Sequence, residues 1–214
     1  MMVLAAAVAV WLAVHLGLAG TRLRGCVVAV LGAIGFRAVF SVLALLSLYL
    51  LVHAWMVAKG PDLWFAPQWL RVLLVLAMLP TFLLFVSAFT RRQAGPPRGM
   101  VRVTRHPMLW SFVLWGVVHA LGTGDLASVV FFGTFVVTAL AGMPSIDAKQ
   151  ARRDPAAFAA LSAATSILPF QAIRQGRNRF VPAEIGWMTI GIAVVAWGAV
   201  FWLHPLLFGV SPLL

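Results

Sequence analysis

The chain has 214 residues, of which 63% are hydrophobic and 10% are charged, and its mean hydropathy is +1.01. These values lie far outside the range of soluble globular domains, so they exclude a soluble protein and indicate an integral membrane protein. The net charge of +11 could suggest nucleic acid. The basic residues fall between apolar runs, however, where they act as topology signals, so we expect membrane lipid and no nucleic acid as partner.

A membrane-spanning helix needs about 20 predominantly apolar residues. Six runs come near that length: residues 1–20, 36–58, 69–90, 107–122, 126–143 and 186–204. No positively charged segment precedes the first run, so we expect it to remain as a span rather than to be removed as a signal peptide. The predicted fold is therefore all-α, a polytopic bundle of about six transmembrane helices in one domain over residues 1–214.

Shorter segments connect these runs. Residues 25–35 are apolar but too short to span, so they are predicted to be interfacial or re-entrant. Gly122 and Gly124 of the GTGD stretch predict a tight turn, in which Asp125 caps the following helix. Asp154 followed by Pro155 is typical of a helix N-terminus, and predicts a short interfacial helix on the membrane surface.

The basic residues occupy alternate loops. They are Arg22 and Arg24; then Arg91, Arg92, Arg98, Arg102 and Arg105; then Lys149, Arg152, Arg153, Arg174, Arg177 and Arg179. By the positive-inside rule these loops face the cytoplasm, which leaves both termini non-cytoplasmic, in the inner membrane of a bacterial-type cell. Trp55, Trp64 and Trp69 are then expected to form an aromatic belt at the outer interface.

The five histidines fall at two depths on this map. His15 and His106 belong to the cytoplasmic side, whereas His53, His119 and His204 belong to the outer side. His106 and His119 lie roughly 20 Å apart along one helix at 1.5 Å per residue, so they cannot share a metal ion. The partners at matching depth are His15 for His106, and either His53 or His204 for His119.

Two neutral imidazoles from facing helices are a common way to hold haem iron, so His15 and His106 are candidate metal ligands and catalytic residues. His106 precedes Pro107 at a helix N-terminus, where the helix dipole disfavours the imidazolium and leaves a lone pair for iron. A hydrogen bond to backbone is the plain alternative role for each histidine. Candidate cations for the haem propionates are Arg22, Arg24, Arg37, Arg102 and Arg105.

Several stretches resemble the NnrU family of bacterial membrane proteins, which are associated with nitrite and nitric oxide reduction and include zeta-carotene isomerase. They are HLGLAGTR at 15–22, FRAVFSVLALLSLYLLVHAW at 36–55, GMVRVTRHPMLWSFVLWGVVHALGTGD at 99–125 and SIDAKQARRDPAAFAALSAATSILPFQAIRQGR at 145–177. The most specific parts are the Arg-His-Pro with the later His and Gly-Asp, and the late LPFQAIRQGR. Together these stretches cover most of the chain.

The resemblance implies haem b held by histidines in a helical bundle. By position, His106 matches the histidine of the family's Arg-His-Pro motif, His15 matches the histidine of its first helix, and His119 matches a later histidine with a supporting role. In the isomerase branch the implied substrate is a hydrophobic polyene. A member outside that branch would bind nitric oxide or pass electrons, and the electron donor is not indicated.

Two other readings stay open at this level. Membrane methyltransferases that modify isoprenylated cysteine also carry Arg-His-Pro before a helix. They expect an aromatic residue two positions after the proline, where this chain has Leu109, and acidic residues late in the chain, where it has Asp147, Asp154 and Glu184. The other reading is a membrane scaffold without a cofactor.

Overall fold

The computed structural model describes residues 1–90 and 95–213, so Arg91 and Arg92 of the predicted basic loop lie outside the described residues. The described part is helical, apart from an isolated bridge between Asp62 and Asp125. In an apolar chain this is expected, because a helix satisfies its backbone hydrogen bonds without water.

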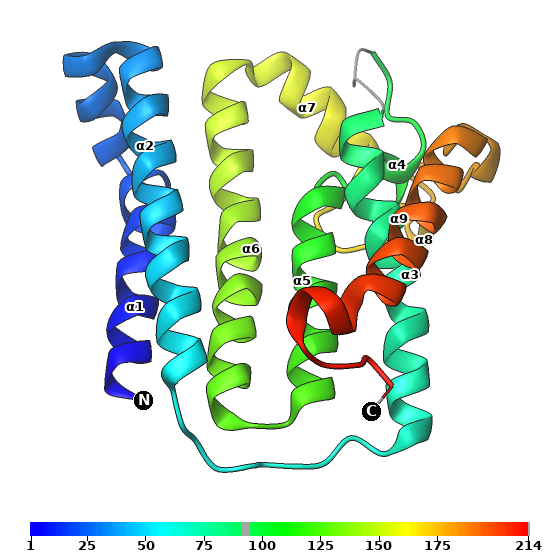
Figure 1. Cartoon of the computed structure of the whole chain (residues 1–214). Helices are drawn as coiled ribbons and strands as arrows, with labels where there is room; N and C mark the ends of the chain where they lie inside the picture. The colour runs from blue at the N-terminus through cyan, green and yellow to red at the C-terminus, as the bar shows by residue number, and fades with distance from the viewer. Residues whose placement is uncertain (91–94, 214) are drawn as a thin grey trace.

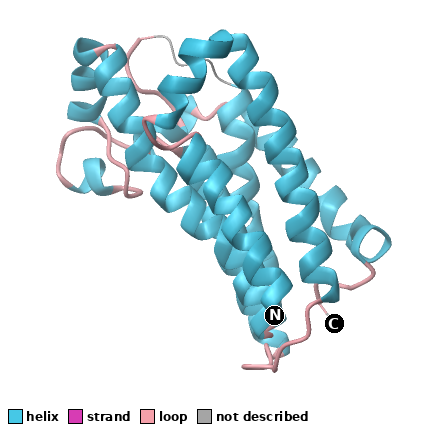
Figure 2. Cartoon of the chain, turned by 90° about the vertical axis from the view of Figure 1, so that its left-hand side faces the viewer, coloured by secondary structure: helices cyan, strands magenta, loops and turns pink. Residues whose placement is uncertain are grey.

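The elements follow one another as α1 (Met2–Leu12), η1 (Ala13–Leu18), α2 (Leu23–Val57), α3 (Gln68–Thr90), α4 (Met100–Val103), α5 (Pro107–Thr123), α6 (Leu126–Arg153), α7 (Pro155–Ala164), α8 (Gln171–Arg174), η2 (Pro182–Glu184) and α9 (Trp187–Phe208). Helix α6 stands between the α1–α2 pair and α5, and α3 and α9 lie on the far side of α5 (Figure 1). The long helices run side by side, and most of the short elements gather at one end (Figure 2).

Four helices are long and apolar enough to cross a membrane: α2, α3, α6 and α9. The other two predicted spans are helical but shorter, since Met2–Leu18 and α5 each fall below 18 residues. The all-helical membrane fold is thus confirmed, whereas the count of six spans stays a prediction. Helix α6 also continues through Pro144 to Arg153, ten residues beyond its predicted end.

Residues 25–35 lie within the range of α2, but the helical backbone is broken at Gly32, where φ is 71° and ψ is 171°, so α2 consists of two helices joined across a kink. Glycine adopts this positive φ at little cost, so Gly32 lets the chain turn between a short first helix and the long second one. The break agrees with the expected separation of this segment from the following span, and its interfacial or re-entrant position stays a prediction. The two predicted helix starts after loops are confirmed: Asp125 caps α6 by accepting from Ser128 N, and Asp154 caps α7 by accepting from Ala157 N.

The turn between α5 and α6 is tied to the loop that joins α2 to α3. Gly124 has φ of 76°, and its carbonyl accepts hydrogen bonds from the backbone of Leu63 and Trp64. The Trp64 indole donates to the Leu121 carbonyl at 2.9 Å. A Cβ on Gly124 would lie 2.1 Å from the Trp64 carbonyl oxygen, so glycine is required here for both conformation and space.

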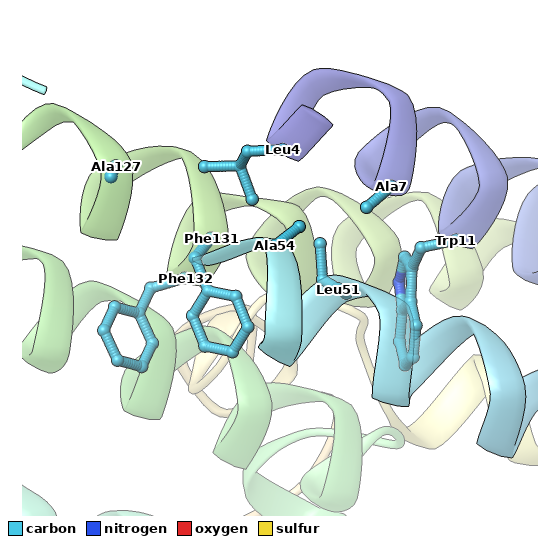
Figure 3. Close-up of a cluster of buried hydrophobic side chains, with 8 residues drawn as sticks. All are labelled: Leu4, Ala7, Trp11, Leu51, Ala54, Ala127, Phe131 and Phe132. Atoms are coloured by element: carbon cyan, nitrogen blue, oxygen red, sulfur yellow. The ribbon is translucent and has the colours of Figure 1, made fainter. Parts of the chain in front are cut away.

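A cluster of buried apolar residues joins α1, α2 and α6 (Figure 3). Its members are Leu4, Ala7, Trp11, Leu51, Ala54, Ala127, Phe131 and Phe132. Between helices in lipid, such close packing supplies the attraction that the hydrophobic effect supplies in water. Trp55, predicted for the outer belt, instead stacks on Phe131 at 4.4 Å and donates to the Ser128 hydroxyl, whereas Trp64 and Trp69 are exposed.

Candidate functional site

Helix α6 presents two different faces to the rest of the bundle. Thr138 and Lys149 bond to the α1–η1 segment, and Asp147 bonds to the entrance of α5. At 100° per residue, Asp147 points about 160° away from Lys149 around the helix axis. The two candidate histidines approach α6 from these opposite faces, so we describe the sites separately.

The first site is an ion-paired cluster of Arg105, His106 and Asp147. The Arg105 guanidinium donates to Asp147 Oδ2 from Nη2 at 2.6 Å and from Nε at 2.8 Å. His106 Nε2 lies 2.9 Å from Asp147 Oδ1. The His106 and Asp147 side chains are 7% and 10% exposed, so the charges are largely removed from solvent.

This geometry determines which nitrogen of the His106 imidazole carries the proton. Asp147 is ionised opposite Arg105 and can only accept, so His106 donates from Nε2–H and keeps its lone pair on Nδ1. Burial lowers the pKa of His106 below its usual range, and outweighs the raising effect of Asp147. The ring is therefore neutral near pH 7, and Nδ1 has no hydrogen-bond partner among residues 1–90 and 95–213.

The backbone around His106 is held by the segment that follows α7. The Thr104 hydroxyl donates to the Ile167 carbonyl at 2.7 Å, and Arg105 N donates to the Ser166 carbonyl at 3.0 Å. Trp110, one turn into α5, also donates to the Ile167 carbonyl. Ser166 and Ile167, directly before the LPFQAIRQGR motif, thus support the Arg-His-Pro motif.

Phe170 shows that this support is under strain. Its backbone has φ of 62°, which is costly for a residue with a Cβ, and its N–H donates to the Val103 carbonyl at 2.8 Å. Strained backbone of this kind persists only where the surroundings fix it, and it gathers at functional sites. The contact between Phe170 and Val103 is therefore one that the surrounding structure holds in place.

Asp147 is the residue of this cluster that the sequence patterns do not single out. They indicate it only as one of a few late acidic residues. The signal that could have found it is a carboxylate inside a helix that is apolar over most of its length, since such a group is usually paired and functional. What the sequence could not supply was its partner, because Arg105 and His106 lie 42 and 41 residues away.

Arg102 is also occupied by an ion pair. Its Nε and Nη2 donate to the two carboxylate oxygens of Glu184, at 2.7 and 3.0 Å. These hydrogen bonds, with one from Gly99 N, lower the pKa of Glu184 to about 2. Two cations predicted to meet haem propionates, Arg102 and Arg105, are thus already paired with carboxylates.

The second site surrounds His15 in η1, a π-helical stretch that the Ala19 N to Val14 O hydrogen bond closes. His15 Nδ1 lies 3.0 Å from the Trp11 carbonyl. Because a carbonyl only accepts, Nδ1 carries the proton and Nε2 the lone pair. The ring stacks on Trp11 at 3.7 Å and meets the edge of Phe40, so His15 is held by neutral groups. π-helical turns occur frequently at functional sites.

The cations that follow η1, in α2 and on the facing side of α6, are held without carboxylates. Lys149 donates to the Ala19 carbonyl at 2.6 Å, Arg24 lies over the Phe36 ring at 5.1 Å, and Arg37 donates to the Ala33 carbonyl. Arg22 is exposed. Within the described residues, none of these four forms an ion pair, so their positive charge stays uncompensated.

His15 and His106 do not face each other. The η1 segment lies on the Lys149 face of α6 and His106 on the Asp147 face, with α6 between them (Figure 1). His106 also has its Nε2 engaged by Asp147. One haem ligated jointly by His15 and His106 does not fit this arrangement.

The remaining histidines lie apart from both sites. His119, predicted to support the haem, donates from Nδ1 to the Trp115 carbonyl at 2.8 Å and packs against Phe132. His204 donates to the Val210 carbonyl, and His53 is exposed beside Tyr49. Over the described ranges, three or more His, Cys, Asp or Glu side chains do not gather into a metal-binding group.

Comparison with known proteins finds relatives of this chain. The chain is 26% identical over 220 residues to the chloroplastic 15-cis-zeta-carotene isomerase of Arabidopsis thaliana, which covers 92% of this chain and 58% of the relative. It is 31% identical over 114 residues to the chloroplastic 15-cis-zeta-carotene isomerase of Zea mays, which covers 51% of this chain and 31% of the relative. No solved structure matches the chain. The family described as NnrU protein matches residues 3–212, and the chain therefore belongs to the NnrU family.

Proposed function

We propose that this protein is a membrane isomerase that rotates a cis double bond of a long conjugated hydrocarbon. The observation that carries the proposal is the alignment of 92% of the chain with a curated 15-cis-zeta-carotene isomerase. The chain spans little more than half of that relative, so the substrate is proposed by class, as an apolar polyene of the carotenoid type. Helices that can cross a membrane fit such a substrate, because a polyene dissolves in lipid and reaches the protein from there.

We also propose haem b as the cofactor, held by His15 rather than by His15 and His106 together. Three features support His15: its unprotonated Nε2, its aromatic neighbours Trp11 and Phe40, and the uncompensated cations Arg24 and Lys149 for the propionates. A carbonyl that accepts from Nδ1–H is the usual way to orient a ligating imidazole. Bound haem would supply redox-active iron, which the side chains of this protein cannot replace.

The Arg105–His106–Asp147 cluster has a different role in this proposal. It fixes the entrance of α5 against α6, and it presents the Nδ1 lone pair of His106 in one orientation. Rotation about a double bond requires that one end of the substrate be held while the other turns. We assign the Arg105–His106–Asp147 cluster to holding and orienting the substrate. The cofactor would supply the chemistry of the reaction.

The isomerase proposal is tested with the purified full chain in lipid nanodiscs. The protein, reduced and loaded with haem, is incubated with 15-cis-zeta-carotene, and the geometric isomers are separated by chromatography. We expect loss of the 15-cis isomer, and at least a tenfold slower loss with His106→Gln than with the control His53→Gln, since His53 is exposed. An unchanged isomer ratio with haem-loaded wild type would reject the proposal.

The cofactor proposal is tested by absorption. Protein from haem-replete cells should show a Soret band and a b-type pyridine haemochrome. His15→Ala should abolish the band, whereas His106→Ala should shift it only slightly and His53→Ala should leave it intact. A band that survives His15→Ala and disappears with His106→Ala would move the iron to the opposite face of α6.

A further inference from the structure

A surface cavity of about 420 Å³ lies between the loop before α4, the end of α7 and residues 176–179. Its lining includes Arg102, Arg177, Asn178 and Arg179, together with Ala164 at the end of α7 and Pro97. Three arginines meet here, and within the described residues only Arg102 has a carboxylate partner, Glu184. His15, His106 and Asp147 do not line the cavity, although Arg177 and Arg105 donate to the same Thr165 carbonyl.

The arginines keep hydrogen-bond donors for a ligand. Arg177 uses Nη1 for the carbonyls of Ser162, Ala163 and Thr165, and Nε for Gln175, which leaves Nη2. Arg102 uses Nε and Nη2, which leaves Nη1. The Arg179 side chain forms no hydrogen bond or ion pair with the rest of the described chain. Guanidinium groups of this kind match the oxygens of a phosphate.

Asn178 adds an independent requirement. Its Nδ2 donates to the carbonyls of Arg102 and Ala164, and these two acceptors fix the orientation of the amide. Its Oδ1 is then buried and has no hydrogen-bond partner. An unsatisfied buried acceptor costs about 1–3 kcal/mol, so it calls for an explanation. A ligand that supplies an N–H or O–H donor beside an anion would remove this cost.

We propose that this cavity binds the headgroup of a glycerophospholipid. The phosphate lies against Arg179 and the free donors of Arg177 and Arg102, and a hydroxyl or ammonium of the same headgroup donates to Asn178 Oδ1. A free phosphate shares the first half of this chemistry. A lipid headgroup fits better, because it carries the donor as well and because the chain has four helices long and apolar enough to lie among lipids.

The test uses the full chain in detergent micelles and native mass spectrometry with short-chain lipids of equal acyl length. Phosphatidylglycerol and phosphatidylethanolamine carry hydrogen-bond donors, whereas the trimethylated nitrogen of phosphatidylcholine carries none. We expect phosphatidylethanolamine to bind more tightly than phosphatidylcholine, although both are zwitterions. Arg179→Gln should weaken phosphatidylglycerol binding about tenfold, and Arg174→Gln, an exposed control outside the cavity, should not.

Three results would overturn the proposal. Equal binding of phosphatidylethanolamine and phosphatidylcholine would contradict the proposed hydrogen bond from the headgroup to Asn178 Oδ1. Equal effects of Arg179→Gln and Arg174→Gln would show that the lipid is attracted to basic residues in general and not to this cavity. Displacement of the lipid by an equal concentration of inorganic phosphate would assign the site to the free ion. Thermal unfolding of both variants checks that each remains folded.

Discussion

The two faces of α6 hold the same residue type in two different ways. On one face, His106 is oriented by a carboxylate that an arginine also binds, and its neighbours are charged and paired. On the other face, His15 is oriented by a backbone carbonyl and an indole ring, and the cations around it have no carboxylate. His106 is thus held in an ion-paired cluster, whereas Nε2 of His15 forms no hydrogen bond within the described residues.

The comparison shows that two histidines predicted at the same depth in a membrane need not contact each other. Both histidines belong to the second half of α6, because Asp147 contacts His106, and Thr138 and Lys149 contact Trp11 and Ala19 on either side of His15. The segments that carry the two histidines nevertheless lie on opposite sides of α6 (Figure 1). Five variants or conditions can break or sharpen this contrast.

The largest effect is expected when Asp147 is replaced by alanine. Arg105 would be left with a mostly buried, unpaired charge, and breaking a buried ion pair in this way costs about 3–5 kcal/mol. Denaturant unfolding in mixed micelles measures the change in free energy, with Asp62→Ala as an exposed control. A loss below 1 kcal/mol would mean that water reaches Arg105 freely.

A double variant separates charge from packing on the same face. Arg105→Met combined with Asp147→Leu removes both charges and keeps apolar bulk, and such replacements are often neutral or stabilising. We therefore expect the double variant to recover most of the stability that Asp147→Ala loses. If it is as unstable as the single variant, the cluster stabilises the fold through its hydrogen bonds to the 165–167 segment and not through charge balance.

A smaller effect is expected on the His15 face from Lys149→Met. The variant removes a charged donor from the Ala19 carbonyl, a bond worth about 1.5–3 kcal/mol. Arg153→Met, four residues later and exposed, is the matched control. Denaturant unfolding again measures the change in free energy. A loss of stability equal to that of Asp147→Ala would contradict the proposed difference between the two faces of α6.

Trp11→Phe should cost about 1 kcal/mol, because it removes the hydrogen bond from the indole to the Thr138 hydroxyl while keeping an aromatic ring beside His15. Trp110→Phe removes the corresponding bond to Ile167 on the other face. Nitrogen NMR of labelled histidine reports the site: only Trp11→Phe should shift the His15 resonances. A shift of the His106 resonances instead would show that the faces are coupled through α6.

The smallest expected effect is a pH response confined to one face. The folded-state pKa of Glu184 is about 2, below its ordinary value of 4.5, so its stabilising contribution is full above pH 4.5 and is lost as pH falls towards 2. Hydrogen exchange should then quicken first in 99–103, which Glu184 and Arg102 hold, and not in 11–18. Glu184→Gln should show the faster exchange already at neutral pH.

Local patterns predicted the local structure well. Asp125, Asp154 and Gly124 of the GTGD turn were assigned correctly, because a cap or a turn depends on residues within one helical turn, whereas Gly122 lies inside α5. His106 likewise precedes α5 with Pro107 at its first position, as expected. The resemblance to the NnrU family also named the family that the comparison confirms.

The predictions that failed concern the direction in which a side chain points around a helix axis. The sequence placed His15 and His106 at one depth, but nothing in a linear pattern says on which side of α6 each lies. Arg102 and Arg105 were expected to be free for an acidic cofactor, and both pair with carboxylates 82 and 42 residues away. By contrast, the expectation that residues 25–35 are separate from the following span agrees with the break in the helical backbone at Gly32.

The π-helical turn of η1 also constrains how this family member can change by insertion or deletion. A π-helical stretch accommodates a residue more than an α-helix of the same rise, so removing one residue from 13–18 would restore regular winding without opening the chain. Because the rise is unchanged, the residues after the deletion would keep their present orientation, and the carbonyls of Ala19 and Gly20 would stay against Lys149 and Ser145. The same deletion in the regular helix α1 would rotate everything after it by about 100°. The π-helical turn is therefore the place in the first third of the protein where a residue can be lost without changing how that part docks onto the rest.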